Sequence, residues 1–431
     1  MKKNLKFLSV FFLCLIFLCI NIAKAESSMD LLLKILIKKG ILTEKEAEEI
    51  IKEVKKEEIK KKKKEEKIEK LEEKETVKKL TKEIEEIKKT VKPLKGVKLG
   101  FLWYISYQNG EKDDKDYSQV VLKRGYLTVK KKFNKWFSAR LTYDITTIKD
   151  PGAGESDPFN LSGSIVGRIK YLYAKFNLPD FIIFTKPYIE IGQVHIPWLD
   201  YEEHTNFYRC QDTMFLERNH IFNSADRGIT FVSLLGGEID EDYQKRVNSH
   251  YPGRYGSIAL GIYNGGGYHA NEKNNNKVIE GRITIRPLPD ILPGLQFSYL
   301  GLYGRGNTKE KPLWRVNLGF LSYEHEYFTF TAQYYDGKGL QSGKDENDKD
   351  GYSFFLEIKP NRKISLIGRY DYFDPNDKQN NDENERYIVG IAYHFYKQHK
   401  NMFLVDYERL DYEDSTKEDE NRLQFTIQVK F

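Results

Sequence analysis

The sequence has few cysteines and only one long apolar run, and each scarcity excludes a class of protein. Three of the 431 residues are cysteine, and two of them, Cys14 and Cys19, lie in the apolar run near the N-terminus. Cys210 alone can form neither an intramolecular disulfide nor a cysteine-based zinc site. A helical membrane protein needs repeated apolar stretches of about 20 residues, so a single run excludes that class.

The apolar run has the features of an export signal. Three lysines precede the apolar residues 7–22, and Ala23-Lys24-Ala25 then provides the small-x-small pattern that signal peptidase cleaves. Residues 1–25 are therefore predicted to be a signal peptide. An uncleaved membrane anchor is the alternative, but the run is short for a membrane span.

Aromatic residues are absent from 26–95, which separates this part of the chain from the rest. It holds 22 lysines and 18 acidic residues, whereas 96–431 holds 44 basic and 46 acidic residues. The net positive charge thus lies outside the part that carries the aromatic residues. A nucleic-acid-binding protein would concentrate positive charge on its folded domain, so no nucleic-acid partner is expected.

The spacing of apolar residues in 26–95 predicts helices. In 26–54 we expect a short helix pair, with Thr43 and Glu46 forming a capping box at the start of the second helix. In 55–95, apolar residues at alternating steps of three and four predict a coiled-coil stalk with one register break. A solvated single helix is the alternative, and a trimer would supply the partner helices. Pro93 and Gly96 are expected to end the stalk.

Beyond Val97 the hydrophobic period changes to two. The clearest example is 422–431, where Leu423, Phe425, Ile427, Val429 and Phe431 alternate with polar residues. Alternation over about ten residues with aromatic residues near the ends is typical of outer-membrane strands. We therefore predict an all-β domain over 96–431, a 16-stranded antiparallel transmembrane β-barrel. Its strands are expected to start near residues 97, 120, 136, 164, 187, 228, 255, 278, 294, 312, 326, 351, 363, 385, 401 and 421.

The connections are expected to alternate between long extracellular loops and short periplasmic turns. The polar stretches 108–119 and 147–163 and the longer stretch 197–227 belong to the predicted long loops. One stretch, 237–254, is too long for the turn expected there. It is either an inserted periplasmic segment or a sign that the predicted strand register is wrong.

If apolar residues face lipid, the other residues of each strand face the lumen. Basic residues predominate among them, and rings of basic side chains in a pore favour anions. Pairing with acids across the wall is the alternative. The predicted pore-lining residues are Lys98, Arg124, Arg140, Arg168, Lys170, Arg282, Arg286, Arg315 and Arg369. The loop 197–227 is the predicted constriction, through Glu202, Arg209, Asp212, Glu217, Arg218 and Arg227; an extracellular cap is its alternative role.

Several motifs resemble the phosphate-selective porin O/P family. They are Gly192-Gln193 with Pro197, the stretch 215–228, Tyr263-Asn264-Gly265 with Arg282 and Pro287, and the segment 39–50. The resemblance covers most of the mature chain and implies a sixteen-stranded trimeric porin with an inward-folded third loop. It implies structural or constriction roles for Glu217, Arg218 and Arg227. It does not imply phosphate specificity, because the channel residues of the family do not map one by one.

Signals for enzymatic chemistry are lacking. None of the eight histidines has zinc-motif spacing, and there is no nucleophile elbow or phosphate-binding loop. We therefore expect no enzyme activity, catalytic residue, cofactor or metal site. The sequence predicts a homotrimeric outer-membrane porin that passes small anions or other hydrophilic solutes, with its stalk in the periplasm. The alternative function is a tether that links the outer membrane to the cell wall, with peptidoglycan as partner.

Overall fold

The computed structural model describes residues 31–147 and 164–431. The predicted signal peptide and nearly all of the predicted loop 147–163 lie outside these residues. The chain forms two compact units that divide between Lys95 and Gly96.

The first unit is helical. Residues 31–38 form one helix, and α2 follows at Glu44–Val91. The predicted capping box is present, because the Thr43 hydroxyl accepts from the Glu46 amide while the Glu46 carboxylate accepts from the Thr43 amide. The short helix η1, Lys92–Leu94, places Pro93 in its first turn and leads to the barrel. No helix among the described residues is both long and apolar enough to cross a membrane.

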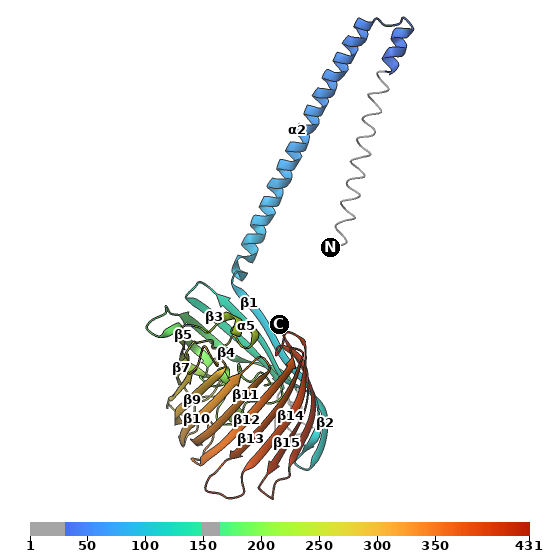
Figure 1. Cartoon of the computed structure of the whole chain (residues 1–431). Helices are drawn as coiled ribbons and strands as arrows, with labels where there is room; N and C mark the ends of the chain where they lie inside the picture. Colours follow the sequence, from blue (N-terminus) through green and yellow to red (C-terminus); the bar gives the residue numbers. More distant parts are fainter. Residues whose placement is uncertain (1–30, 148–163) are drawn as a thin grey trace, which may run out of the picture. The chain divides into compact units, whose positions relative to one another are not determined.

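The second unit is a closed antiparallel barrel of sixteen strands, as predicted (Figure 1). Each strand pairs with its neighbours in sequence, and β1 pairs with β16 to close the ring. All sixteen observed strands start within five residues of the predicted positions. The strands are β1 Val97–Lys112, β2 Lys115–Lys132, β3 Phe137–Thr147, β4 Ile165–Asn177, β5 Phe184–His195, β6 Ala225–Leu235, β7 Gly256–Tyr263, β8 Val278–Ile285, β9 Leu295–Arg305, β10 Leu313–Glu324, β11 Phe328–Lys338, β12 Asp348–Asn361, β13 Ile364–Asp374, β14 Asn384–Tyr396, β15 Asn401–Tyr412 and β16 Glu420–Lys430.

Most strands alternate between an exposed apolar face and a buried polar face, and β9 and β10 are the clearest exceptions. In β12, exposed Phe354 and Leu356 alternate with buried Ser353 and Glu357. This arrangement suits a barrel with lipid outside, because closure pairs every strand and leaves no open edge. We call the barrel end where β1 begins and β16 ends the terminal rim, and the opposite end the loop rim.

One predicted connection differs from the one observed, and at a second the structure decides between two alternatives. The expected loop 108–119 is instead a two-residue hairpin, in which Asp113 and Asp114 have φ of 51° and 59°. Aspartate tolerates this left-handed conformation, and such turns match the twist of paired strands. The stretch 237–254 is an insertion and not a register error. It belongs to the connection 236–255 at the terminal rim, here called the rim insert, which carries α5 (Glu241–Arg246).

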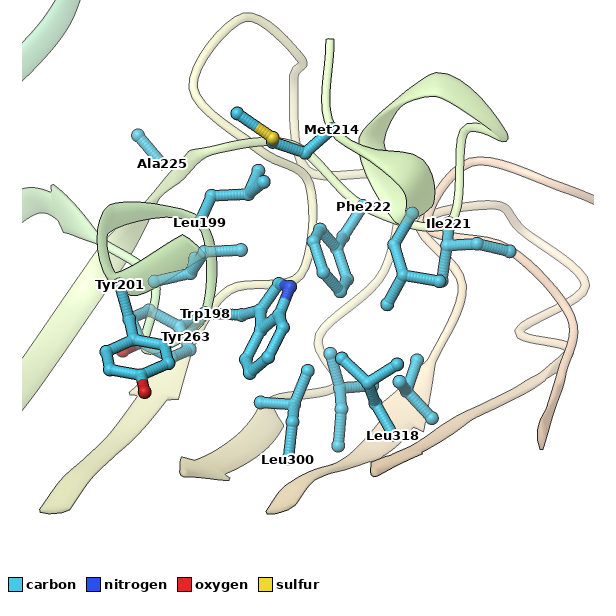
Figure 2. Packing of buried hydrophobic residues seen from close by; sticks show 14 of the residues in the cluster. Trp198, Leu199, Tyr201, Met214, Ile221, Phe222, Ala225, Tyr263, Leu300 and Leu318 are labelled. Carbon is cyan, nitrogen blue, oxygen red and sulfur yellow. The ribbon is translucent and has the colours of Figure 1, made fainter. Parts of the chain in front are cut away.

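The connection between β5 and β6, residues 196–224, is the inner loop. It contains α3 (Leu199–Glu202) and α4 (Phe215–Arg218), and most of its apolar residues are fully buried. Figure 2 shows Trp198, Phe222 and Ile221 packed beside Leu300 and Leu318 of the wall. The core of the barrel unit is therefore largely the contact between this loop and one side of the wall.

Candidate functional site: the lumen and its constriction

Apolar packing fixes the root of the inner loop. Its buried residues form one cluster with side chains of β9 and β10 that point into the lumen. The wall residues of this cluster include Leu300, Leu302, Trp314, Val316, Leu318 and Phe320. Burying several large side chains, each contributing about 1.5–3 kcal/mol, holds the loop inside the barrel.

Arg282 of β8 ties the root of the loop to the wall. It is 1% exposed, its Nε donates to the Pro197 carbonyl at 3.0 Å, and its Nη1 donates to Ser257. Its guanidinium also lies 4.3 Å from the centre of the Tyr201 ring and 5.0 Å from that of Tyr251. Arg282 thus contacts the wall, the inner loop and the rim insert together.

Glu202 forms a second anchor of the inner loop. Its carboxylate accepts from Trp198 Nε1 at 2.8 Å and from Gln333 Nε2 of β11 at 2.8 Å. Burial raises the pKa of Glu202 to about 7, because these two neutral donors only partly replace water.

The tip of the inner loop binds the opposite wall. Lys123 of β2 donates to the carbonyls of Cys210 at 2.8 Å and Gln211 at 2.6 Å, and Gln424 Nε2 of β16 donates to the same Gln211 carbonyl at 2.8 Å. Lys123 reaches the lumen because the β1–β2 register shifts there, so that Tyr104 pairs with Arg124 and Ile105 with Leu122. Such a β-bulge re-aims a side chain. The loop therefore crosses the lumen from wall to wall.

The β12–β14 wall holds another part of the loop. Tyr208 donates to Glu357 at 2.7 Å, and Arg218 pairs with Asp371 at 3.0 Å. Arg369 donates to the Thr213 carbonyl at 3.0 Å while pairing with Asp371 at 2.9 Å. Most charged side chains of the β12–β14 wall therefore bind the inner loop.

The rim insert contacts the inner loop from the terminal rim. Tyr251 donates to Asp200 at 2.5 Å, and Asn248 donates to the His204 carbonyl at 2.6 Å. The rings of His204 and His250 stack with centroids 3.9 Å apart. Two connections from opposite ends of the barrel therefore meet inside it and narrow the lumen together.

The wall formed by β2–β4 keeps an excess of positive charge. Arg124, Arg140, Arg168 and Lys170 face the loop here, with Asp144 as the shared acid, 2.8 Å from Arg168 and 3.7 Å from Arg124. Arg140 contacts His195 at 3.0 Å and the Tyr171 ring at 4.5 Å, and within the described residues it has no carboxylate within 4.0 Å.

The inner loop presents carboxylates on its side of this passage. Glu203 and Glu217 both pair with Arg209, which also donates to Tyr126 of the wall at 3.0 Å. Arg209 lowers the pKa of Glu217 against the opposing effect of burial. The electric field thus runs across the passage, from the basic wall to the acidic loop.

A cavity of about 660 Å³ lies at the terminal rim, between the inner loop, the rim insert and the turns of β12–β15. We call it the vestibule. Its single lining carboxylate among the described residues is Glu203, and its basic lining residues are Arg209, Lys245, Arg246, Arg362, Lys363, Lys397, Lys400 and Lys430. The vestibule is strongly basic.

The structure sorts the nine predicted pore-lining residues into groups. Arg124, Arg140, Arg168 and Lys170 line the lumen, although Lys170 is buried against the Tyr126 hydroxyl at 3.1 Å. Lys98 lies exposed at the start of β1. Three others serve mainly as anchors: Arg282 and Arg369 hold the inner loop, and Arg286 donates to the Gly253 carbonyl of the rim insert.

Arg315 was predicted to face the lumen, and this is wrong. Its neighbours Trp314 and Val316 are buried inward, so Arg315 lies on the outer face, where it contacts Asp336 at 3.3 Å. The cause is the inner loop. The apolar surface of the inner loop packs against apolar residues of β10, so these residues face inward. In a strand that lines a water-filled lumen, the polar residues would face inward instead.

Five of the six predicted constriction residues belong to the inner loop. These are Glu202, Arg209, Asp212, Glu217 and Arg218; Asp212 pairs with Arg218 at 3.6 Å and with Arg422 of β16 at 3.3 Å. Arg227 is not one of them. It lies in β6, exposed on the outer face, because buried Asp226 and Thr230 set the inward positions of that strand.

Sequence reasoning missed Lys123, the basic turns of the vestibule and a histidine cluster. Glu357, His394 and His399 offer possible metal-ligand atoms within 4.8 Å of one another. However, His394 Nδ1 accepts from the His399 amide at 3.2 Å, which places the proton on Nε2, the nitrogen that faces Ser365 at 3.0 Å. A protonated nitrogen is no metal ligand. Glu357 and His394 are instead arranged as hydrogen-bond partners of Tyr208, and His399 Nε2 contacts Glu357 at 2.8 Å.

No protein-family model matches the chain, and no curated protein matches it. Solved structures match over 78% of this chain. They include the anion-selective porin of Comamonas acidovorans (10% identity, 99% of that chain, TM-score 0.52), OmpF of Salmonella typhi (11%, 97%, 0.52) and OprB of Pseudomonas putida (10%, 94%, 0.53). At such low identity these likenesses show a shared fold. The chain has the sixteen-stranded barrel fold of outer-membrane porins.

Proposed function

We propose that this protein is an outer-membrane porin that lets small hydrophilic solutes diffuse across the membrane. The observation that carries the proposal is the closed sixteen-stranded barrel, whose lumen is crossed by an anchored loop and contains a cavity of about 660 Å³ at the terminal rim. A charged lumen inside an apolar outer face is suited to passing polar solutes. The basic vestibule is open to the terminal rim.

The proposed channel prefers anions. The support is the charge of the described lumen. The β2–β4 wall has four basic side chains against Asp144, and the vestibule has eight basic lining residues, of which Arg209, Lys245 and Arg246 pair with carboxylates. Positive potential between low-dielectric walls raises the local concentration of anions. The carboxylates of the inner loop oppose this effect, so the preference is expected to be moderate.

The test is the reversal potential of the protein in a planar bilayer under a salt gradient. We expect an anion-selective potential that moves toward zero in Arg140→Gln and Arg168→Gln. Arg315→Gln is the matched control, because it removes the same charge from the outer face. A cation-selective wild type, or an equal shift in the control, would reject the anion preference; absence of conductance would reject the porin.

Phosphate is the solute suggested by the motifs that resemble the O/P family. Block of chloride conductance by inorganic phosphate at millimolar concentration would support it. Equal conductance with and without phosphate would limit the proposal to a general anion-preferring porin.

The helical unit favours a second function, that of a tether to the cell wall. Its α2 has 48 residues and is about 72 Å long at ~1.5 Å per residue. We propose that it extends into the periplasm, where the basic run Lys60–Lys64 meets an anionic partner. Removal of residues 44–91 is expected to detach the outer membrane while conductance is kept; an unaltered envelope would reject the tether.

A further inference from the structure

His195, the last residue of β5, lies between a lumen arginine and a buried acid. Its Nε2 is 3.0 Å from Nη1 of Arg140, and its Nδ1 is 2.9 Å from the Glu190 carboxylate. The His195 side chain is 13% exposed, which lets protons from water reach it, whereas the Glu190 side chain is 4% exposed. The imidazole therefore links Arg140 to an acid held within the wall.

The two contacts determine which nitrogen of the neutral ring carries the proton. A guanidinium group only donates hydrogen bonds, so Nε2 of His195 must accept from Arg140. A neutral imidazole has one donor and one acceptor, so its proton lies on Nδ1 and is donated to Glu190. The observed geometry is thus that of neutral His195, with both nitrogens satisfied.

The other groups that hold Arg140 are neutral. Its Nε donates to Thr142 at 2.9 Å, its guanidinium lies 4.5 Å from the centre of the Tyr171 ring, and Tyr173 is a further neighbour. The Tyr171 ring also packs against the imidazole of His195, with ring centroids 4.1 Å apart. The orientation of the guanidinium therefore depends on which hydrogen bond His195 can offer it.

Protonation of His195 removes that hydrogen bond. Both ring nitrogens then donate, so Nε2–H faces an N–H of Arg140 and two like charges meet. Asp200 of α3 offers an acceptor, because its Oδ1 is 3.6 Å from Nε2. Burial acts to raise the pKa of Asp200, but nearby histidines, the Tyr251 hydroxyl and Arg140 hold it below its usual range, so the carboxyl is ionised. The imidazolium therefore turns from Arg140 toward Asp200.

Charged and titratable groups of several elements surround His195. They are Lys130 of β2, Arg140 of β3, Tyr171, Tyr173 and Lys175 of β4, Glu190 of β5, Tyr263 of β7, Asp200, Glu203 and His204 of the inner loop, and Tyr251 of the rim insert. From β6, Thr230 contributes a neutral hydroxyl that donates to the His195 carbonyl. The acids nearest to the two ring nitrogens are Glu190 and Asp200, and together they can accept both protons of the imidazolium.

We propose that His195 is a positioning residue that sets how far Arg140 enters the passage, and thereby the selectivity of the channel. Neutral His195 holds the guanidinium against the wall beside Tyr171. Protonated His195 releases it toward the passage, where it attracts anions. Acid therefore strengthens the anion preference through Arg140. The inference rests on the proposed channel function and names a residue that regulates it.

The test measures the change in reversal potential caused by Arg140→Gln at pH 5 and at pH 8, in three backgrounds. In the wild type we expect the change to be about twofold larger at pH 5, because the released guanidinium faces the passage. In His195→Gln the change should be equal at both pH values, because an amide can accept from Arg140 and donate to Glu190 but cannot ionise. His325→Gln, in the turn between β10 and β11, is the matched control and should behave as the wild type does.

Two results would overturn the role of His195. One is an equal change at both pH values in the wild type. The other is a pH-dependent change that persists in His195→Gln, because Glu202, His204 or another group would then cause it. The quantity compared is a difference between variants, so it judges His195 whichever ion the wild type prefers. A cation-selective wild type would reject only the anion preference.

A second readout does not require conduction. In detergent, nitrogen NMR of histidine-labelled protein distinguishes protonated from unprotonated ring nitrogens. The resonances that disappear in His195→Gln identify His195, and at pH 8 they should show the proton on Nδ1. A proton on Nε2 at pH 8 would overturn the proposal, because such a ring cannot accept from Arg140.

Discussion

At the scale of single residues, the basic side chains of the lumen divide into two kinds. Arg282 and Arg369 are almost fully buried and hold backbone carbonyls of the inner loop, whereas Arg140 and Arg168 remain partly exposed to the passage. A guanidinium group whose N–H donors bind carbonyls of the protein mainly stabilises the structure and is less available to bind a solute. The two kinds therefore predict different phenotypes.

Replacing Arg282 by methionine is expected to loosen two connections together. The change leaves the Pro197 carbonyl and Ser257 without their donor and removes the cation beside Tyr201 and Tyr251. Leaving a buried hydrogen-bonding group without its partner costs roughly 1–3 kcal/mol. We expect a lower melting temperature and noisier single-channel current. Arg254→Met, which breaks an exposed pair with Asp290, is the control and should alter neither; a quiet channel in Arg282→Met would contradict this role.

Cys210 reports the position of the inner-loop tip. It is fully buried, and burial raises the pKa of its thiol to about 12, so the reactive thiolate is scarce at neutral pH. We expect slow labelling of the wild type by a maleimide. Lys123→Met removes the donor to the Cys210 and Gln211 carbonyls and should speed the labelling at least tenfold. Lys98→Met is the control; equal rates in all three proteins would show that Lys123 does not hold the tip.

At the scale of elements, the inner loop and the rim insert share the task of narrowing the lumen. Each is short of regular structure, and each is held by side chains of the wall and of the other connection. The inner loop, the longer of the two connections, is thus held in place by the burial of its side chains and not by backbone pairing within the loop. Its stability should depend on the protonation of the groups it buries.

Glu202 makes the inner loop sensitive to pH. Its pKa in the folded protein is about 7, above the ordinary value of 4.5, so the folded state favours the protonated form. The stabilisation is complete below about pH 4.5, is lost as pH rises toward 7, and stays lost above it. A shift of this size corresponds to roughly 3 kcal/mol. Hydrogen exchange of residues 198–206, corrected for intrinsic rates, should be slower at pH 5 than at pH 8.

Glu202→Gln tests the source of that pH dependence. Glutamine cannot ionise, so the difference in exchange between pH 5 and pH 8 should largely vanish. Glu203→Gln is the matched control, because Glu203 is the neighbouring acid and pairs with Arg209. If the dependence persists in Glu202→Gln, another group of the loop causes it.

At the scale of the whole molecule, all sixteen strands could be predicted from the sequence, whereas the site could be predicted only in part. The strands could be predicted because their pattern depends only on neighbouring residues: one side of each strand faces lipid and the other faces the interior, so apolar and polar residues alternate. The orientation of Arg315 is not local, because it depends on apolar residues of the inner loop more than ninety positions earlier. The sequence pattern did not reveal Lys123, because a β-bulge shifts its strand, or the position of Arg227, because the predicted loop ended three residues too late. Contacts between segments far apart in sequence thus determine side-chain orientations that the local pattern does not predict.

The barrel is closed by β16, which pairs with β1. Phe101 and Phe431 exchange both backbone hydrogen bonds, at 2.8 and 3.0 Å, while every other strand pair joins neighbours in sequence. Hairpins can therefore form one after another during insertion, but the ring waits for β16. That final step must bring together ends some 330 residues apart in sequence, a costly encounter unless the earlier hairpins have already curved the sheet. Until then β1 and β16 expose unpaired edges, so the unfinished barrel is at its most vulnerable to mispairing just before it is complete.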